Sequence, residues 1–244
     1  MVAISFQGVR KSFRQGLGRR PVLHGLDLEV RHGEIYGFIG PNGAGKSTSI
    51  KLLLNFLNPD QGRLFIAGRE VGRRRFQELI GYLPETPCFY ENLTGHETVC
   101  FAGRAAGLNG AALRERGREV LASVDLATAA SSRVRTYSKG MKQRLGLAVA
   151  LVHDPDIYIL DEPMSGLDPM GRHLVTNIIM DLKERKKTVF FSSHILNDVE
   201  VMCDRVGILH RGCLVFSGPM ADLLRAGESL EDVFMRFVQN PGSA

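Results

Sequence analysis

One glycine-rich stretch constrains the fold of this chain more than any other feature. It reads Gly40-Pro41-Asn42-Gly43-Ala44-Gly45-Lys46-Ser47-Thr48 and fits the pattern G-x-x-x-x-G-K-[ST]. An apolar run ends at Ile39 just before it, and a helix-like segment from Ile50 follows. A phosphate-binding loop requires this strand, loop and helix order, because its backbone N–H groups and the following helix N-terminus both attract anionic oxygens.

Five residues extend this interpretation towards phosphoryl chemistry. Lys46 would reach the β- and γ-phosphates of a nucleotide, and the Ser47 hydroxyl would bind Mg²⁺. Asp161 and Glu162 follow a second apolar run, where Asp161 can complete metal coordination and Glu162 can take a proton from an attacking water. His194 ends a third apolar run and could contact a γ-phosphate, although a lone histidine there is more often structural.

A further anion site is indicated upstream of Asp161. Ser138 stands at the N-cap position of a predicted helix, and Gly140 lies in its first turn. Taken alone, this is a capped helix. Its position shortly before Asp161 and Glu162 favours a phosphate-facing loop instead.

Composition sets the class of protein. The chain has 244 residues, 44% hydrophobic and 23% charged, and a net charge of +5. It has neither a signal-peptide pattern nor an apolar run near the roughly 20 residues of a membrane helix, so we expect a cytoplasmic protein. The four cysteines show no C-x-x-C pairing and are expected to be reduced. Basic clusters at 10–20 and 73–75 are interpreted as solvated faces, with contact to nucleic acid or anionic lipid as the alternative.

The order of patterns predicts an α/β fold in several parts. We expect an antiparallel pair of strands at 2–10 and 22–30, joined by a basic loop from Arg14 to Pro21. The remaining predicted strands are 34–39, 63–67, 80–83, 157–160, 188–192, 205–209 and 213–216. Predicted helices are 75–79, 170–186, 195–202 and a tail over 219–239. Residues 86–150 are predicted to be all helical, starting with a Thr94/Glu97 capping box.

Taken together, these motifs resemble the nucleotide-binding subunit of ATP-binding cassette (ABC) transporters, from about residue 2 to about residue 220. The resemblance implies a P-loop NTPase core with a mainly parallel sheet, an N-terminal antiparallel β subdomain and an inserted all-helical subdomain. The expected division is one ABC ATPase domain over 1–220 and a C-terminal helical tail over 221–244. Within that domain, 1–85 and 151–220 form the core, and 86–150 carry the signature loop.

The resemblance also assigns roles to single residues. Phe13 matches the aromatic residue that stacks on adenine, and Glu85 falls at the Q-loop position, near Mg²⁺. His194 matches the switch histidine. The signature loop and the D-loop contact ATP bound to another subunit, and the matching residues here are Ser138, Lys139, Gly140 and Asp168.

Two departures from the family pattern stand out. Glu85 replaces the usual glutamine, which adds negative charge near the γ-phosphate and leaves its protonation state open. In the signature loop, Lys139 and Met141 replace the usual residues, while Ser138 and Gly140 are kept. Lys139 could contact phosphate or face water. Because no essential group is lost, we expect an active ATPase.

By resemblance, ATP and Mg²⁺ are the ligands, and two identical chains sandwich two ATP molecules across a two-fold axis. A separate integral membrane permease would dock a short helix beside Glu85 and residues 90–101, placing the protein on the inner face of the cell membrane. Candidate contacts are Phe89, Tyr90, Leu93 and Phe101. For Phe101, a buried position in the core of the helical subdomain is at least as good an interpretation. Motifs near the C-terminus resemble single-domain ATPases of exporter type.

Two other functions are compatible with parts of this pattern. One is a soluble ABC-type ATPase that acts on ribosomes, nucleic acid or a protein complex; such relatives usually carry two cassettes or added binding segments, and we expect no nucleic-acid partner here. The other is an unrelated P-loop kinase or GTPase, against which Ser138, the pair Asp161-Glu162 and His194 argue. The transported substrate is not encoded in these motifs.

Overall fold

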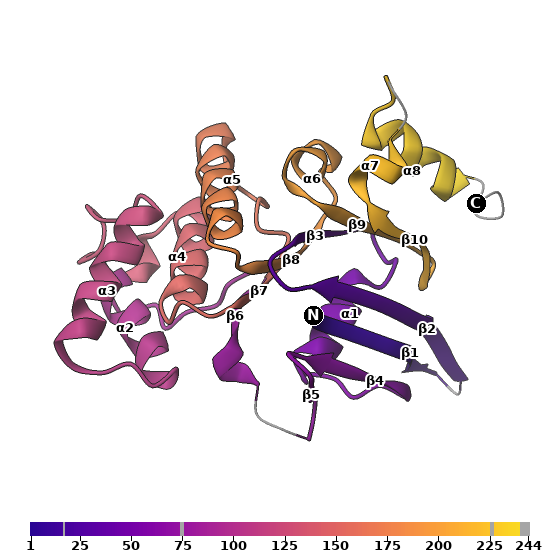
Figure 1. The fold of residues 1–244 in the computed structure, drawn as a ribbon. Helices are drawn as coiled ribbons and strands as arrows, with labels where there is room; N and C mark the ends of the chain where they lie inside the picture. The colour runs from indigo at the N-terminus through magenta and orange to yellow at the C-terminus, as the bar shows by residue number, and fades with distance from the viewer. Residues whose placement is uncertain (17, 74–75, 225–226, 240–244) are drawn as a thin grey trace.

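Two β-sheets and eight α-helices make up the described part of the computed structural model, which comprises residues 1–16, 18–73, 76–224 and 227–239. The first sheet is antiparallel, with strand order β2-β1-β4-β5 (Figure 1). Its strands are β1 (Val2–Gln15), β2 (Gly18–Arg31), β4 (Gln61–Ile66) and β5 (Arg69–Glu70). The predicted antiparallel pairing of the N-terminal strands is confirmed.

The second sheet has six strands in the order β10-β9-β3-β8-β7-β6. All neighbours are parallel except β9 and β10. Its strands are β3 (Ile35–Ile39), β6 (Ile80–Leu83), β7 (Ile157–Asp161), β8 (Thr188–Ser193), β9 (Arg205–His210) and β10 (Cys213–Pro219). The central strands β3, β7 and β8 are buried throughout, as expected for parallel strands covered on both faces. Their carboxyl ends lie at one edge of the sheet, where ligands bind in such folds.

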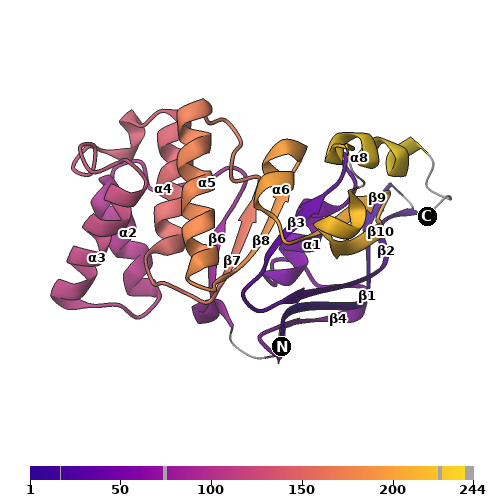
Figure 2. The same cartoon turned by 45° about the horizontal axis from the view of Figure 1, so that its top comes forward.

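Helices cover both faces of this sheet. They are α1 (Lys46–Leu53), α2 (Gly95–Ala105), α3 (Gly110–Ser123), α4 (Lys139–Leu151), α5 (Pro169–Glu184), α6 (Leu196–Met202), α7 (Met220–Leu223) and α8 (Leu230–Gln239). Helix α1 packs between the two sheets, in a core with side chains from β1, β2, β3 and β4. The opposite face of the six-stranded sheet lies under α5 and α6, and α2, α3 and α4 gather at one side (Figure 2).

The segment that follows β6 is helical as predicted. Thr94 caps α2 in a complete capping box: its hydroxyl accepts from the Glu97 N–H, and the Glu97 carboxylate accepts from the Thr94 N–H. Besides α2, α3 and α4, it contains a 3₁₀ turn, Val134–Thr136. The domain boundaries at 86, 150 and 220 stay predictions.

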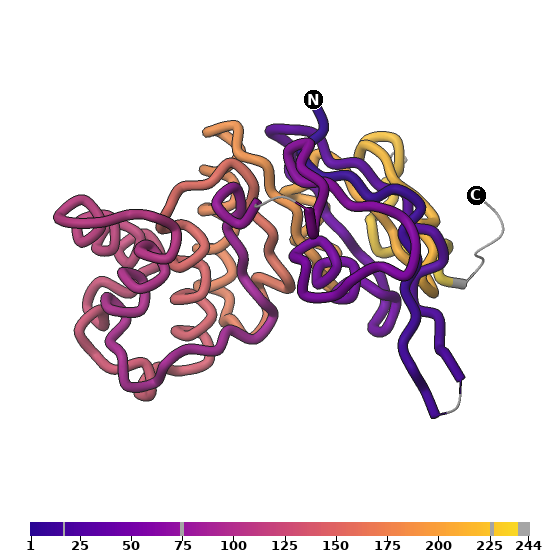
Figure 3. Tube along the Cα trace, turned by 90° about the horizontal axis from the view of Figure 1, so that it is seen from below, coloured from indigo at the N-terminus to yellow at the C-terminus, as the bar shows by residue number. Residues whose placement is uncertain are grey.

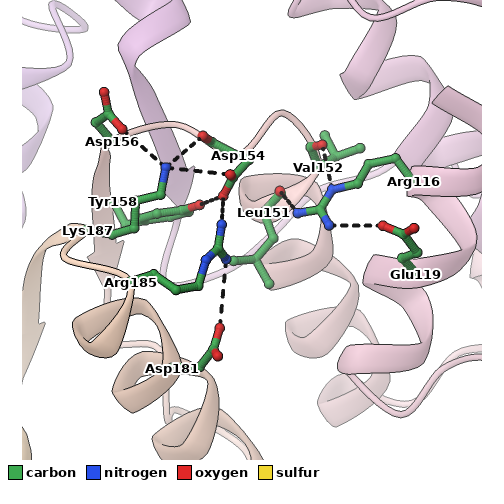
Figure 4. A network of polar contacts seen from close by, with 10 residues as sticks. All are labelled: Arg116, Glu119, Leu151, Val152, Asp154, Asp156, Tyr158, Asp181, Arg185 and Lys187. Carbon is green, nitrogen blue, oxygen red and sulfur yellow. Dashed lines mark hydrogen bonds and ion pairs between the residues drawn. The ribbon is translucent and has the colours of Figure 1, made fainter. Parts of the chain in front are cut away.

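A polar network joins α3 to the end of α4 (Figure 4). The Arg116 guanidinium donates to the carbonyl oxygens of Leu151 at 3.2 Å and Val152 at 3.3 Å. These carbonyls lie in the last turn of α4, where no intrahelical donor remains. Arg116 also pairs with Glu119 on its own helix, at 3.2 Å. Arg116 therefore acts as a side-chain cap that holds α4 against α3.

The same network continues to the loop before β7 (Figure 4). Asp154 pairs with Arg185, at the end of α5, at 2.5 Å, and with Lys187, before β8, at 3.6 Å. Burial would raise the pKa of Asp154, but the Arg185 hydrogen bond and the charges of Lys187, Arg185 and Arg116 outweigh it and hold that pKa below its usual value. The network connects the α2–α4 region to the parallel sheet.

The N-terminal hairpin is longer than predicted. Instead of a loop from Arg14 to Pro21, the pairing of β1 and β2 continues to Gln15 opposite Gly18, and the hairpin projects from the body (Figure 3). Asp60, far along the chain, accepts from the Ser12 N–H at 2.7 Å and pairs with Arg19 at 3.4 Å. This end of the hairpin buries no core face, so its sequence lacks the alternation that marks a half-buried strand.

Two other predicted elements differ from the structure. The short helix expected at 75–79 is a 3₁₀ turn, Gln77–Leu79, and Arg74 and Arg75 lie outside the described residues. The single tail helix expected over 219–239 is two helices, because Leu224 is extended after α7. Leu230 and Val233 of α8 are buried in the main core.

All four cysteines are free, as expected. Across the described ranges, no helix has the length and apolar character to cross a membrane.

Candidate functional site

The glycine-rich loop lies between β3 and α1. Gly43 and Gly45 have φ values of 80° and 115°, which residues with a side chain rarely adopt. A Cβ atom on Gly40 would lie 2.3 Å from the Leu209 carbonyl oxygen, so the loop can pack against β9 only with glycine there. Glycine at these positions keeps the backbone N–H groups accessible to an anion.

Lys46 begins α1 and is buried under the loop. Its ammonium donates to the Gly40 carbonyl oxygen at 2.7 Å and lies 4.0 Å from the Glu162 carboxylate. Burial lowers the pKa of Lys46, while the charges of Glu162, Asp161 and Glu85 oppose that shift. Of these three carboxylates, Glu162 pairs with the Lys46 ammonium, and the charges of the other two act on it from further away.

Asp161 is the last residue of β7, and parallel pairing places it opposite Ser192 of β8. The Ser192 hydroxyl donates to its carboxylate at 2.5 Å. Burial raises the pKa of Asp161, and the Glu85 and Glu162 charges add to that, against the Ser192 hydrogen bond and Lys46. A bound cation at this carboxylate would offset the burial and the like charges.

Glu162 turns the chain away from the sheet. Its φ of 50° is unusual for a residue with a side chain, and such strain is found at functional positions. Its N–H is held by the Ser192 carbonyl at 3.2 Å and hydroxyl at 3.0 Å. Its carboxylate lies 2.7 Å from Nδ1 of His194 and 3.3 Å from the His194 N–H. The carboxylate is therefore fixed between His194 and Lys46.

A cavity of about 400 Å³ opens over this edge of the sheet. It brings together the glycine-rich loop, the predicted site residues Glu85, Glu162 and His194, and two residues of β2. The lining residues are Arg20, Val22, Pro41, Asn42, Gly43, Ala44, Gly45, Lys46, Ser47, Thr48, Glu85, Glu162 and His194. All but two were expected from the sequence.

Phe13 does not line the cavity. It pairs with Arg20 across the hairpin, and cross-strand partners have side chains on the same face. The Phe13 ring therefore lies on the cavity side of the hairpin, 38% exposed, with the Lys11 ammonium 5.6 Å from its centroid. Sequence reasoning missed Arg20 because it stands in a basic cluster that was interpreted as a solvated face.

The residues expected to act on another subunit form a second surface. Ser138 caps α4 by accepting from the Met141 N–H at 3.2 Å, and Asp168 caps α5 by accepting from the Gly171 N–H at 2.7 Å. Lys139 packs against Gly166, since a Cβ atom there would lie 2.7 Å from the Lys139 Cε. None of the three capping and packing side chains lines the cavity.

The residues near the cavity suit a magnesium ion. Ser47, Asp161 and Glu85 offer hydroxyl and carboxylate oxygens, the ligands that Mg²⁺ prefers, and Mg²⁺ needs few protein ligands because it keeps several waters. The three carboxylates around Lys46 leave negative charge that a divalent cation would balance. Among the described residues, no cluster of three or more His, Cys, Asp or Glu side chains could hold a metal unaided.

Two exposed aromatic side chains, Tyr90 before α2 and Phe101 on it, lie outside the cavity lining. Tyr90 and Phe101 are 70% and 56% exposed, and their rings meet edge to face at 6.0 Å, so the interpretation of Phe101 as core is wrong. Phe89, in contrast, packs against the core. Next to Phe101, a cavity of about 750 Å³ lies between the end of α2, Tyr82 of β6 and α4.

Comparisons with known proteins agree on one family. The sequence model described as "ABC transporter" matches residues 23–165. An uncharacterized ABC transporter ATP-binding protein of Synechocystis is 47% identical over 85% of the chain, which spans only 59% of that relative. The Nod factor export ATP-binding protein I of Paraburkholderia xenovorans is 36% identical, covering 98% of the chain and 78% of the relative. A solved ATP-binding subunit of an ABC transporter superposes with a TM-score of 0.86, at 32% identity, over 96% of this chain and 98% of that one.

Proposed function

This chain belongs to the ABC transporter family of ATPases, and we propose that it hydrolyses ATP to drive transport by a separate membrane permease. The observation that carries the proposal is the Glu162 carboxylate, held between His194 and Lys46 at the cavity. A carboxylate fixed beside a phosphate-binding loop is suited to activate water. Relatives named for export, such as the Nod factor protein, support outward transport.

In this proposal, the loop N–H groups and Lys46 bind the phosphates of ATP in the cavity. Ser47, Asp161 and Glu85 would hold Mg²⁺, which would neutralise charge on the phosphate oxygens. Lys46 is already buried and oriented by Gly40, so it loses little freedom when the phosphates bind. Phe13, on the cavity side of the hairpin, stacks on adenine.

Glu162 accepts a proton from the attacking water. When the carboxylate is ionised, the Nδ1–H of His194 donates to it, leaving Nε2 directed elsewhere. A neutral imidazole in this tautomer offers only a lone pair at Nε2, so a hydrogen bond from His194 to the γ-phosphate requires the imidazolium form. His194 thus both orients the base and, when protonated, stabilises charge on the phosphate.

Two chains complete the site. Ser138, Lys139, Gly140 and Asp168 lie on a surface apart from the cavity of their own chain. In a homodimer with two-fold symmetry, this surface of one chain covers the cavity of the other, so each ATP lies between two subunits. Because ATP bridges the interface, dimerisation is coupled to nucleotide binding.

The permease docks on the exposed surface of Tyr90 and Phe101, at α2. A short helix at the cytoplasmic side of the permease would cover Tyr90 and Phe101, whose exposed rings bury apolar surface only when a partner binds. This places the chain peripherally on the inner face of the membrane. Tyr90→Glu should reduce permease binding, while Val201→Glu, equally exposed on α6, should not. Unchanged binding by Tyr90→Glu would exclude this docking site.

Co-purification tests the transporter function directly. A tagged Glu162→Gln variant is held with ATP and Mg²⁺, membranes are solubilised gently, and the captured proteins are identified. We expect an integral membrane protein in equal amount to the chain. A ribosome or soluble protein complex instead, with no membrane protein, would replace the transporter function by that of a soluble ABC-type ATPase.

A further inference from the structure

We propose that Arg20 binds the phosphate chain of the nucleotide at its adenine-proximal end, within the same subunit. The inference rests on the proposed ATP site and assigns it a cationic group outside the glycine-rich loop. Arg20 lies on β2, two residues before Val22, and both side chains line the cavity. The pairing of β1 and β2 is interrupted by a β-bulge at Val22, and Arg20 and Val22 both line the cavity on either side of Pro21.

The position of Arg20 along the cavity follows from its neighbours. The Val22 carbonyl oxygen would lie 3.4 Å from a Cβ atom on Gly45, so this part of β2 passes over the loop just before Lys46. Two residues along a strand span roughly 7 Å, which carries Arg20 from the loop towards the hairpin end. There it pairs with Phe13. Glu162 and His194 contact Lys46 and each other instead, at the end where the γ-phosphate is cleaved.

The charge on Arg20 is available for a ligand. Lys11 and Arg19, in the same basic cluster, both pair with Asp60. The Arg20 guanidinium, by contrast, makes no hydrogen bond or ion pair with any group in the described residues, and it is exposed to solvent. A planar guanidinium with free donors suits phosphate oxygens, which it can bind in a bidentate manner.

Arg19 supplies a matched control, because it is adjacent in sequence, has the same charge and is paired away with Asp60. The affinities of ATP, ADP and adenosine are measured by calorimetry with Mg²⁺, in a Glu162→Gln background that prevents turnover. For Arg20→Gln we expect the affinities for ATP and ADP to fall by nearly the same factor, roughly tenfold, and the affinity for adenosine to stay unchanged. Arg20→Lys should recover part of the loss, and Arg19→Gln should change the affinities less than about twofold.

The outcomes separate this inference from the ATP site itself. Equal affinities for Arg20→Gln and Arg19→Gln would overturn the role of Arg20 while leaving the site intact. A loss of affinity for ATP but not for ADP would overturn the proposed placement of Arg20, because that result would put the guanidinium at the γ-phosphate. If the Glu162→Gln parent binds neither ATP nor ADP, the nucleotide site is wrong, and Arg20 has no role to play.

Discussion

The carboxylate of Glu162 and Nδ1 of His194 lie 2.7 Å apart, although the two residues follow different strands of the parallel sheet. The contact exists because β7 and β8 are neighbours and end at the same edge. The Glu162 backbone, held by Ser192, has the left-handed conformation that turns the carboxylate towards His194. Glu162 and His194 are thus positioned by the sheet itself.

Replacing His194 tests that contact. His194→Ala removes the group that orients the Glu162 carboxylate, so ATP hydrolysis should fall about 100-fold, with a much smaller change in ATP affinity. Phosphate release and ATP binding are measured on the same preparation. His173→Ala is the control, since His173 is exposed on α5 and bonds only to Asn177. Hydrolysis at the wild-type rate in His194→Ala would remove His194 from the mechanism.

Mixing two inactive variants tests whether Ser138 acts on the other subunit. Lys46→Ala lacks the phosphate-binding lysine, and Ser138→Arg blocks the second surface. In a mixed dimer, one site combines intact Lys46 of one chain with intact Ser138 of the other, so activity should reappear on mixing. Each variant alone at the same total concentration is the control. If the two residues serve the same chain's site, no mixture gains activity.

Arg116 is predicted to stabilise the α3–α4 packing. Arg116→Ala leaves the last carbonyls of α4 without their charged donor, so the free energy of unfolding should fall by about 1–2 kcal/mol. Denaturant unfolding measures the change, with ATP affinity unaffected. Arg118→Ala is the matched control, because Arg118 is exposed and pairs only with Glu115. Equal stability of the two variants would show that the cap contributes nothing.

His153 should make stability depend on pH. Burial lowers its pKa below the usual 6.5, although its hydrogen bond to the Ile80 carbonyl and the Asp154 charge act the other way. Below pH 6.5 the unfolded chain therefore binds more protons than the folded chain, and stability falls with falling pH until the folded pKa is passed. The depressed pKa of Asp154 acts only below pH 3.8 and does not interfere.

Unfolding free energies from pH 8 to pH 5 measure this effect. His153→Gln can keep the hydrogen bond without titrating. The slope of its unfolding free energy against pH should therefore be smaller than that of the wild type, by at most about 1.4 kcal/mol per pH unit. His32→Gln, at an exposed position, should retain the wild-type slope. Identical slopes for His153→Gln and the wild type would contradict the burial effect.

Local motifs made the cavity predictable, and long-range contacts explain what was missed. Asp161 ends a buried strand, Glu162 follows it, and Lys46 follows the glycine-rich loop after another buried strand, so sequence order alone places them at one sheet edge. Arg20 could not be placed, because the length of its hairpin depends on Asp60, which anchors Ser12 and Arg19 from a distant segment.

The break in the C-terminal tail had a local signal that was overlooked. The Ser229 hydroxyl accepts from the Asp232 N–H and the Asp232 carboxylate accepts from the Ser229 N–H, both at 3.2 Å, so this pair caps the start of α8. A distant group adds to it, because the Glu200 carboxylate of α6 accepts from the Leu230 N–H at 2.9 Å. Exposure of Phe101 also depends on tertiary packing, because the sequence gives its helix but not the face that is left uncovered.

ATP binding and turnover by Glu162→Gln test the central claim most directly. The control is Glu184→Gln, at an exposed position on α5. We predict that Glu162→Gln binds ATP with Mg²⁺ about as tightly as the wild type, forms a dimer with ATP, and hydrolyses it at least about 100-fold more slowly. Hydrolysis by Glu162→Gln at the rate of Glu184→Gln and the wild type would contradict the account.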